Sequence, residues 1–515
     1  MEQREQWGSR VGFILAAAGS AIGLGNIWRF PYVAYENGGG AFLIPYLFAL
    51  LTAGIPMLLL EFGIGRLGKG SAPLSLSRFS RKFEWLGWWQ VMICFVITTY
   101  YVAIIAWTIM YFFYSFNLSW GQDTEAFLFG TYLGVPEAVV TEQGWHFGSL
   151  QWDVFLPLLA VWAGSYYVLQ RGVRRGIEAL SKIVMPILFI IMILFVIRAA
   201  TLPGAETGLN LLFTPDFNKI FPAFLGGTNE QWYTVWMAAY GQIFFSFSVA
   251  FAIMITYSSY LNEKQEINNS GFIMAFSNSG FEFLAAIGVF GAIGFMAAAS
   301  GLPAEEVVTA GVGLAFVVFP QIVNSLPFLN SFIGAMFFLS LLIAGFTSFI
   351  SIVEVLIAAV SDKFRLSRKA AVNWVVGISG LISIVYATGA GIVLLDIVDH
   401  FINSFGIVIS GLVEVLFLGW LHNISRIREE NNLVSDFRIG YWWNIMIKFV
   451  TPLVLLYTTY MNFELELSQA YEDYPIHALV TFGWAMVAAT IVIAFLLAYA
   501  IRWKNDENKQ EVFRT

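Results

Sequence analysis

Charged residues are scarce in this sequence: 12% of its 515 residues are Asp, Glu, Lys or Arg, whereas 58% are hydrophobic. A typical soluble domain has about 25% charged residues, so this chain lacks the polar surface of a soluble protein. Apolar stretches of about 20 residues, long enough to cross a bilayer, recur about twelve times. The composition therefore predicts a polytopic membrane protein.

Cysteine is nearly absent, since Cys94 is the only one in the sequence and lies inside an apolar stretch. An intrachain disulfide is impossible, which excludes a disulfide-bonded secreted scaffold. The four histidines are scattered without the spacing of a metal site. There is no basic stripe for nucleic acid and no nucleophile–base constellation. We therefore expect no nucleic-acid partner and no enzymatic activity.

The apolar stretches predict an all-α protein whose spans fall into three groups. Residues 1–200 would hold the N-terminal tail and five spans, residues 201–420 the next five, and residues 421–515 two more and a tail. The spans are expected at 11–37, 41–66, 87–116, 153–169, 177–200, 232–260, 267–298, 329–361, 370–388, 391–420, 441–461 and 476–501.

The distribution of Lys and Arg predicts the orientation of these spans. Of the 27 basic residues, 23 fall in the two tails and alternate loops, while the opposite loops hold only Lys219. Both termini are thus expected in the cytoplasm, with the protein in a bacterial inner membrane. The opposite loops are acidic, which we interpret as a solvated surface rather than attraction of cations. The N-terminus resembles a signal peptide, but its apolar stretch continues through Tyr35, so we expect no cleavage.

The first span contains residues that an ordinary lipid-facing helix lacks. Within Gly19–Pro31, close packing of small residues explains Gly19 and Gly23 but not Asn26 and Arg29. Glycine weakens a helix by about 1 kcal/mol relative to alanine, and a charge inside the membrane costs more. Non-helical backbone at membrane depth must face protein or a watery cavity. We therefore predict a functional break in this span.

A second polar interruption, Gly241–Phe251, lies in the sixth span. Serines can bond to their own helix, so this stretch alone is a weak signal. However, the first and sixth spans each open a block of five, and paired interrupted helices indicate a transporter site. Further oxygen-bearing side chains in later spans suit a hard cation. They are Asn278, Glu282, Thr347, Ser348, Ser351, Glu354, Asp396 and Asp399.

The segments Gly23–Phe42, Gln242–Phe251, Asn278–Glu282 and Ala344–Ser348 occur in the order and at the spacing of a known family. On these residues the chain resembles the neurotransmitter:sodium symporters, whose bacterial members include a leucine transporter. The resemblance implies about 12 transmembrane helices: a 5+5 inverted repeat with helices 1 and 6 broken, then two C-terminal helices. It also implies alternating-access symport of a neutral L-amino acid, hydrophobic and small to medium-sized, with about two sodium ions.

The sequence leaves a receptor function open and argues against an ion channel. An amino-acid-binding membrane receptor with little net transport is the alternative to a symporter. An ion channel would need repeated filters or rings of charge, and the sequence contains neither.

The same resemblance implies roles for individual residues. The first sodium site would use the Asn26, Ser246 and Asn278 side chains, the Ala21 carbonyl and the substrate carboxylate. The second sodium site would use the carbonyls of Gly19, Ile22 and Ala344 and the hydroxyls of Thr347 and Ser348. The substrate pocket would comprise Ala21, Gly23, Leu24, Gly25, Ile97, Tyr101, Phe245, Ser246, Ser248, Phe251, Ser348 and Ile352. Arg29 and Asp399 would form an extracellular gate, and Arg4, Trp7, Tyr260 and Asp362 a cytoplasmic latch.

Three departures from the family pattern bear on function. Val249–Ala252 contains alanines where relatives place glycine, which leaves the extent of the second break open. Phe349 replaces a small polar residue and would narrow the pocket. Gly23 stands where carriers of monoamines have an aspartate, so we expect zwitterionic substrates rather than amines.

Glu282 is expected to take the place of chloride. Chloride-dependent relatives hold the anion with groups equivalent to Tyr46, Gln242, Ser246 and a serine, and Glu282 replaces that serine. A fixed carboxylate so near the first sodium site can offset the sodium charge, so no chloride is expected. The alternative is a buried, protonated glutamate without an ionic role, and the two forms could alternate within one cycle.

Overall fold

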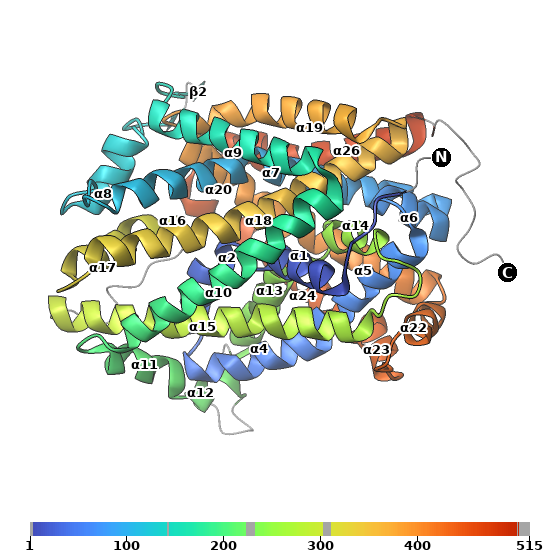
Figure 1. Ribbon diagram of the computed structural model, residues 1–515, viewed down its shortest axis with the longest axis horizontal. Coiled ribbons are helices and arrows are strands. Elements are labelled where there is room, and N and C mark those ends of the chain that lie inside the picture. The colour runs from blue at the N-terminus through green and yellow to red at the C-terminus, as the bar shows by residue number, and fades with distance from the viewer. Residues whose placement is uncertain (1–3, 142–143, 223–231, 302–310, 502, 504–515) are drawn as a thin grey trace.

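In the computed structural model the chain is almost entirely helical (Figure 1), and the structure describes residues 4–141, 144–222, 232–301, 311–501 and 503. The one sheet within those ranges is a short antiparallel hairpin of β1 (Val140–Thr141) and β2 (Gly144–Trp145). The all-α prediction is therefore confirmed.

Within the described residues, ten helical segments are long and apolar enough to span a membrane. They are Gly40–Gly68 (with α4, Leu43–Ala49, and α5, Ile55–Gly68), Arg81–Tyr114 (α7, Glu84–Tyr114), Trp152–Gln170 (α9), Val173–Ala200 (α10, Ala179–Ala200), Asn268–Ala299 (α15, Asn268–Ser300), Asn330–Phe364 (α18), Arg368–Ala387 (α19, Arg368–Ser383), Gly391–Leu421 (α20, Gly391–Phe401, and α21, Val408–Leu416), Trp442–Asp473 (α23, Trp442–Ile445, and α24, Thr451–Ser468) and Ile476–Ala500 (α25, Ile476–Ala478, and α26, Ala485–Phe495).

The first and sixth spans, which are predicted to be broken, are not among these ten continuous segments. The first is a pair of helical segments, Arg10–Ala21 and Leu24–Glu36, bent by 59°. The sixth consists of α13 (Trp232–Ser246) and α14 (Ile253–Ser259), each too short to cross a bilayer alone. The connecting segments carry the shorter helices α6 (Ala72–Phe79), α8 (Thr124–Ala126), α11 (Ala205–Phe213), α12 (Phe217–Ile220), α16 (Gly311–Gly313), α17 (Phe319–Ser325) and α22 (Ile424–Leu433).

The first span lies in the centre of the bundle (Figure 1), where α1 (Arg10–Ala21) packs against α10, α15 and α18. Ser9 caps this helix by accepting a hydrogen bond from the Gly12 amide over 3.0 Å, as an N-cap serine does. In the most apolar window of each span, 83% of the α18 span is buried but only 28% of the α24 span and of the α26 span. The last two spans are therefore peripheral, and the centre is built from the first ten.

Arg4 and Trp503, the first and last residues that the structure describes, lie on the same side of the bundle. Arg4 pairs with Asp362 over 3.1 Å, and the neighbouring Lys363 lies 4.5 Å from the centre of the Trp503 ring. This arrangement is the one expected when an even number of segments crosses the membrane.

Candidate functional site

The break in the first span is a two-residue interruption of the helix. α1 ends at Ala21 and α2 (Leu24–Trp28) begins after Gly23, with ψ angles of 83° at Ile22 and −166° at Gly23. The Gly23 amide donates to Asn26 Oδ1 over 3.0 Å and to the Ala21 carbonyl over 2.8 Å. α3 (Phe30–Glu36) continues the second half of the span. The predicted break is confirmed, and Asn26 stabilises it from within.

The second break extends over residues 247–252, between the end of α13 and the start of α14. Ser248, Ala250 and Ala252 have φ angles of 53°, 70° and 71°. This left-handed conformation costs a residue with a side chain about 1–2 kcal/mol, yet the alanines adopt it here. The helix is therefore interrupted over residues 247–252 even though positions 250 and 252 are alanine and not glycine.

Three side chains predicted for the first sodium site form one buried chain of hydrogen bonds between the two breaks and α15. Asn26 Nδ2 donates to Asn278 Oδ1 over 2.9 Å, and Asn278 Nδ2 donates to Ser246 Oγ over 3.1 Å. Each side chain is at most 1% exposed. Their oxygens are hard ligands of the kind that sodium prefers, so the donor set fits the ion.

The residues predicted for the second sodium site lie where α1 faces α18. A Cβ placed on Gly19 would lie 3.5 Å from Thr347 Cβ, so the backbone there approaches Thr347 closely. Thr347 Oγ1 donates to the Ile343 carbonyl over 2.9 Å and to the Ala344 carbonyl over 3.1 Å. Ile22 donates its amide to the Ala18 carbonyl and is the first residue of the break. The Thr347 hydroxyl and the Ala344 carbonyl therefore meet on α18, close to the backbone of Gly19.

The predicted pocket centres on Gly23. A Cβ placed there would lie 3.3 Å from Tyr101 Oη and 3.4 Å from Ser348 Oγ. The Leu24 amide donates to Tyr101 Oη over 3.4 Å, and a Cβ on Gly25 would overlap the Phe245 ring. The break, α7, α13 and α18 therefore converge on one small volume.

The remaining pocket residues follow from helix geometry. Ile97 precedes Tyr101 by four residues and Ile352 follows Ser348 by four, so each shares a face with its partner. Phe349 is fully buried, with its ring 6.5 Å from that of Tyr101 and 5.1 Å from that of Trp162. The ring thus lies between Tyr101 and Trp162, and its narrowing of the pocket stays a prediction.

Two further pocket residues belong to the second break. Ser248 Oγ donates to the Ser20 carbonyl over 3.1 Å, which ties the two breaks together. The Phe251 carbonyl accepts a hydrogen bond from Cys94 Sγ over 2.9 Å. Ala21 is buried at the end of α1.

The two residues predicted as the extracellular gate do not bond to each other in the part of the chain that the structure describes. The Arg29 guanidinium lies 4.2 Å from the centre of the Phe245 ring, a cation–π contact. Asp399 Oδ1 instead accepts hydrogen bonds from Tyr100 Oη over 2.6 Å and Asn403 Nδ2 over 2.8 Å. The predicted outer pair thus makes no direct ion pair within the described residues, although the two groups are close enough to interact electrostatically, and each member has another partner.

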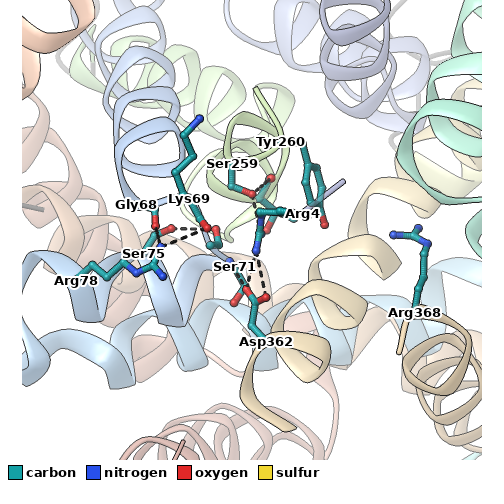
Figure 2. A network of polar contacts seen from close by, with 12 residues as sticks. Arg4, Gly68, Lys69, Ser71, Ser75, Arg78, Ser259, Tyr260, Asp362 and Arg368 are labelled. Atoms are coloured by element: carbon teal, nitrogen blue, oxygen red, sulfur yellow. Dashed lines mark hydrogen bonds and ion pairs between the residues drawn. The ribbon is translucent and has the colours of Figure 1, made fainter. Parts of the chain in front are cut away.

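The predicted cytoplasmic latch is closed by direct bonds (Figure 2). Arg4 Nη1 lies 3.1 Å from both carboxylate oxygens of Asp362, and Arg4 Nη2 donates to Ser259 Oγ over 2.8 Å. The Ser71 amide also donates to Asp362 over 2.7 Å. Burial lowers the pKa of Arg4, but attraction to Asp362 and Tyr260 outweighs it and leaves that pKa above its usual value. Arg4 therefore stays charged.

Trp7 closes the same latch from the N-terminal tail. Its indole donates to the Tyr257 carbonyl over 2.8 Å, and its amide donates to the Tyr260 carbonyl over 3.2 Å. Tyr260 Oη in turn donates to Glu354, over 2.8 Å. Arg368, which Figure 2 shows apart from Asp362, donates to Glu354 over 2.7 Å.

Glu282, predicted to take the place of chloride, lies beside two of the groups named in that prediction, Tyr46 and Gln242. It is fully buried, and it accepts hydrogen bonds from Gln242 Nε2 over 2.7 Å and from Tyr46 Oη. Tyr46 also bonds to Ser279 over 2.8 Å. Glu282 is one turn from Asn278, so the carboxylate adjoins the Asn26–Asn278–Ser246 chain.

Sequence reasoning missed several buried charges. Lys363 pairs with Glu84 over 2.7 Å, and Glu61 and Glu414 are fully buried in the α5 and α21 spans. Ionisable residues within a span are a signal for function by themselves. Glu61 and Glu414 could have been found on that basis, but their common location could not.

Comparisons with known proteins agree with this geometry. The family model described as "Sodium:neurotransmitter symporter family" matches residues 4–135 and 136–505. An uncharacterised sodium-dependent transporter of Methanocaldococcus jannaschii is 40% identical over 96% of this chain and 97% of its own. The sodium- and chloride-dependent GABA transporter 2 of Bos taurus is 31% identical over 88% of this chain and 79% of its own. The sodium-dependent dopamine transporter of Caenorhabditis elegans is 26% identical over 92% and 82%. The chain therefore belongs to the sodium:neurotransmitter symporter family: it is a multi-pass, sodium-dependent secondary transporter and not an enzyme.

Proposed function

We propose that this transporter couples sodium entry to uptake of a neutral L-amino acid of small to medium size, without chloride. The observation that carries the proposal is the buried chain Asn26–Asn278–Ser246 beside Gly23 and Tyr101. It brings oxygen ligands for sodium next to hydroxyl and amide donors that suit a carboxylate. A substrate carboxylate bound there would also reach the sodium ion, which couples the two.

Sodium would enter as cargo at two positions. At the first, Asn26 Oδ1, Asn278 Oδ1 and Ser246 Oγ would turn from one another to the ion, in exchange for their mutual hydrogen bonds. At the second, Thr347 and the carbonyls at the end of α1 would supply the ligands. Oxygen-only sites of this kind favour hard cations over transition metals.

The substrate class follows from what surrounds Gly23. The residues assigned to the pocket are apolar or neutral polar, so a charged substrate side chain would be desolvated without a partner. Gly23 supplies no carboxylate for an amine, which makes the ligand's own carboxylate necessary. The Phe349 ring beside Tyr101 supports a preference for small aliphatic side chains over bulky ones.

Glu282 supports transport without chloride. Tyr46 and Gln242 hold its carboxyl group by hydrogen bonds, and in its ionised form this group would put a fixed negative charge beside the proposed first sodium position. That charge would offset sodium at low local dielectric, which is the role of the anion in chloride-dependent relatives.

We place the protein in the cytoplasmic membrane of a prokaryote, with both termini in the cytoplasm. The excess of basic residues on the side of Arg4 and Lys363 supports this orientation. The latch is closed on that side, while Arg29 and Asp399 make no direct ion pair among the described residues, which supports an arrangement that is more open on the opposite side.

A binding screen tests the substrate class. Purified protein would be assayed by scintillation proximity with neutral, charged and decarboxylated ligands, each in sodium and in potassium. We expect sodium-dependent binding of neutral amino acids, and none of tryptamine or tyramine. Tight sodium-dependent binding of either amine, or a preference for lysine or glutamate, would reject the proposed substrate class.

A further inference from the structure

Two carboxyl groups outside the proposed sodium and substrate sites lie against the unwound part of the sixth span. Glu61, on α5, accepts a hydrogen bond from the Ala250 amide. Ser410, on α21, donates to the Ala250 carbonyl over 2.6 Å. Glu414, one turn beyond Ser410, accepts from Gln90 Nε2 over 2.6 Å. The two carboxyl groups therefore flank the same turn of backbone, and they are close enough to interact electrostatically.

Each group has an unused acceptor. Glu61 Oε2, Glu414 Oε1 and Gln90 Oε1 are buried and lack a hydrogen-bond partner among the described residues. All three are oxygens, while the Ala250 amide and one hydrogen of Gln90 Nε2 are already engaged. The second hydrogen of Gln90 Nε2 could serve only one of the three oxygens. The cluster therefore lacks a donor hydrogen. Buried polar atoms in folded proteins are nearly always paired, so this deficit indicates something that supplies one.

Among the residues that the structure describes, no cation pairs with either carboxyl group. Neither Glu61 nor Glu414 takes part in an ion pair in the described ranges. The basic residue further along α5, Arg66, instead donates to the Glu430 carbonyl over 2.7 Å. The titratable group that faces Glu61 from α7 is the Cys94 thiol, itself a donor to Phe251. Two adjacent negative charges without a counter-ion are very unfavourable inside a membrane.

We propose that Glu61 and Glu414 form a proton-binding site in which Glu414 carries one proton on Oε1 and donates it to Glu61 Oε2. The backbone amide bonded to Glu61 favours the charged form of that group, so the proton belongs on Glu414. One O–H group on Glu414 then satisfies the unused oxygens of the two carboxyl groups, Glu414 Oε1 and Glu61 Oε2, though not Gln90 Oε1. It also leaves the pair with a single negative charge. A proton shared by two oxygens needs no further ligands, whereas a metal cation would need a coordination shell of several.

Because the two carboxyl groups contact the turn at Ala250, the proton affects the stability of that turn. The turn at Ala250 connects α13, which ends at Ser246, to α14, which runs toward Tyr260 of the latch. When the proton leaves for solvent, both carboxyl groups are ionised and repel each other. The contacts of Glu61 and Ser410 with Ala250 then weaken. The proton thus stabilises the segment between the proposed sodium position and the latch.

Glu414→Gln is an isosteric mimic of the protonated form. Its amide oxygen can accept from Gln90 and its NH2 group can donate to Glu61, as the protonated acid would. Glu61→Gln tests the pair from the other side, because its NH2 group would donate to Glu414 and make the proton unnecessary. The exposed Glu429→Gln, on α22, is the matched control.

Infrared spectroscopy of the full-length protein detects the proton directly. At neutral pH, the wild type and Glu429→Gln should show a deuterium-sensitive carboxylic-acid C=O band that is missing from Glu414→Gln and Glu61→Gln. Identical carboxylic-acid bands in the wild type and Glu414→Gln would overturn the proposal. A sodium-dependent rise in Tm that Glu414→Gln abolishes, without any band difference, would assign a cation to the pair and overturn it too.

The pH dependence of stability is the second readout. The folded wild type would retain a proton that the unfolded chain loses, so its stability falls as pH rises. Glu414→Gln lacks this contribution, and the ratio of their unfolding equilibrium constants should change about tenfold per pH unit from about pH 5 to about pH 7. The variant's advantage in Tm should therefore grow with pH. A Tm difference that is constant over that range would contradict proton retention.

Discussion

Gln242 donates a hydrogen bond to the Glu282 carboxylate over 2.7 Å, at the inner end of the sixth span's first helix. The carboxylate thereby adjoins Asn278 and Ser246, the residues that we assign to sodium. We propose that Glu282, when ionised, supplies the negative charge that an anion brings to this position in chloride-dependent relatives.

Chloride should be dispensable for the wild type and required by Glu282→Ser. Replacing chloride with gluconate should leave wild-type uptake unchanged, because Glu282 already offsets the sodium charge. The serine variant loses that charge, so its uptake should fall at least about tenfold in gluconate, equivalent to about 1.4 kcal/mol. The exposed Glu429→Ser serves as control. Collapse of wild-type uptake in gluconate would show that Glu282 does not replace the anion.

Arg29→Ala should impair transport while leaving the fold intact. Arg29 rests on Phe245 here, and we expect it to pair with Asp399 when the outer side closes. An arginine can bond a carboxylate with two parallel hydrogen bonds, which Arg29→Lys cannot reproduce fully. Uptake should drop about tenfold or more in the alanine variant and less in the lysine variant. Wild-type uptake rates in Arg29→Ala would remove this residue from gating.

Asp362→Asn should loosen the latch. The substitution removes the charge that Arg4 contacts at 3.1 Å through both oxygens. Breaking a partly buried pair leaves the other charge poorly compensated. Hydrogen–deuterium exchange at the Trp7 amide, which bonds to Tyr260 in the closed latch, should therefore accelerate. Asp436→Asn, at an exposed position, should leave exchange unchanged. Equal exchange in Asp362→Asn and wild type would show that the pair does not hold the latch.

Ala252→Gly should stabilise the protein slightly. Ala252 has a φ of 71°, a conformation that glycine adopts without strain. The relief of about 1–2 kcal/mol is partly offset by the greater freedom of glycine in the unfolded chain, which costs about 0.4–1 kcal/mol. Thermal unfolding should show a small rise in Tm. The contrasting Ala239→Gly, inside helix α13, should lower Tm because glycine weakens a helix. A lower Tm for Ala252→Gly would mean that the methyl group contributes more than the strain costs.

Local composition made most of the fold predictable from the sequence. Long apolar stretches specify the spans, and Gly23 and Asn26 mark the first break because neither suits a continuous lipid-facing helix. The extent of the second break was not predictable, since Ala250 and Ala252 adopt left-handed angles that only surrounding contacts enforce.

Long-range relationships were the part that sequence could not supply. The separation of Arg29 from Asp399 depends on which state of the cycle the protein occupies, and a sequence encodes all of them. Glu61 and Glu414 lie in distant spans, and only the packing of α5 and α21 around Ala250 brings them together. The latch was predictable through family resemblance, although its Glu354–Arg368 bond was not.

Uptake into proteoliposomes tests sodium-coupled amino-acid transport most directly. Wild-type protein, given an inward sodium gradient, should accumulate a radiolabelled neutral amino acid above its external concentration and lose it when an ionophore dissipates the gradient. Asn278→Ala, which removes the central member of the Asn26–Asn278–Ser246 chain, should abolish accumulation, whereas the exposed Glu429→Gln should not. Sodium-dependent binding without accumulation would indicate a receptor, and accumulation that is independent of sodium would contradict the proposed coupling.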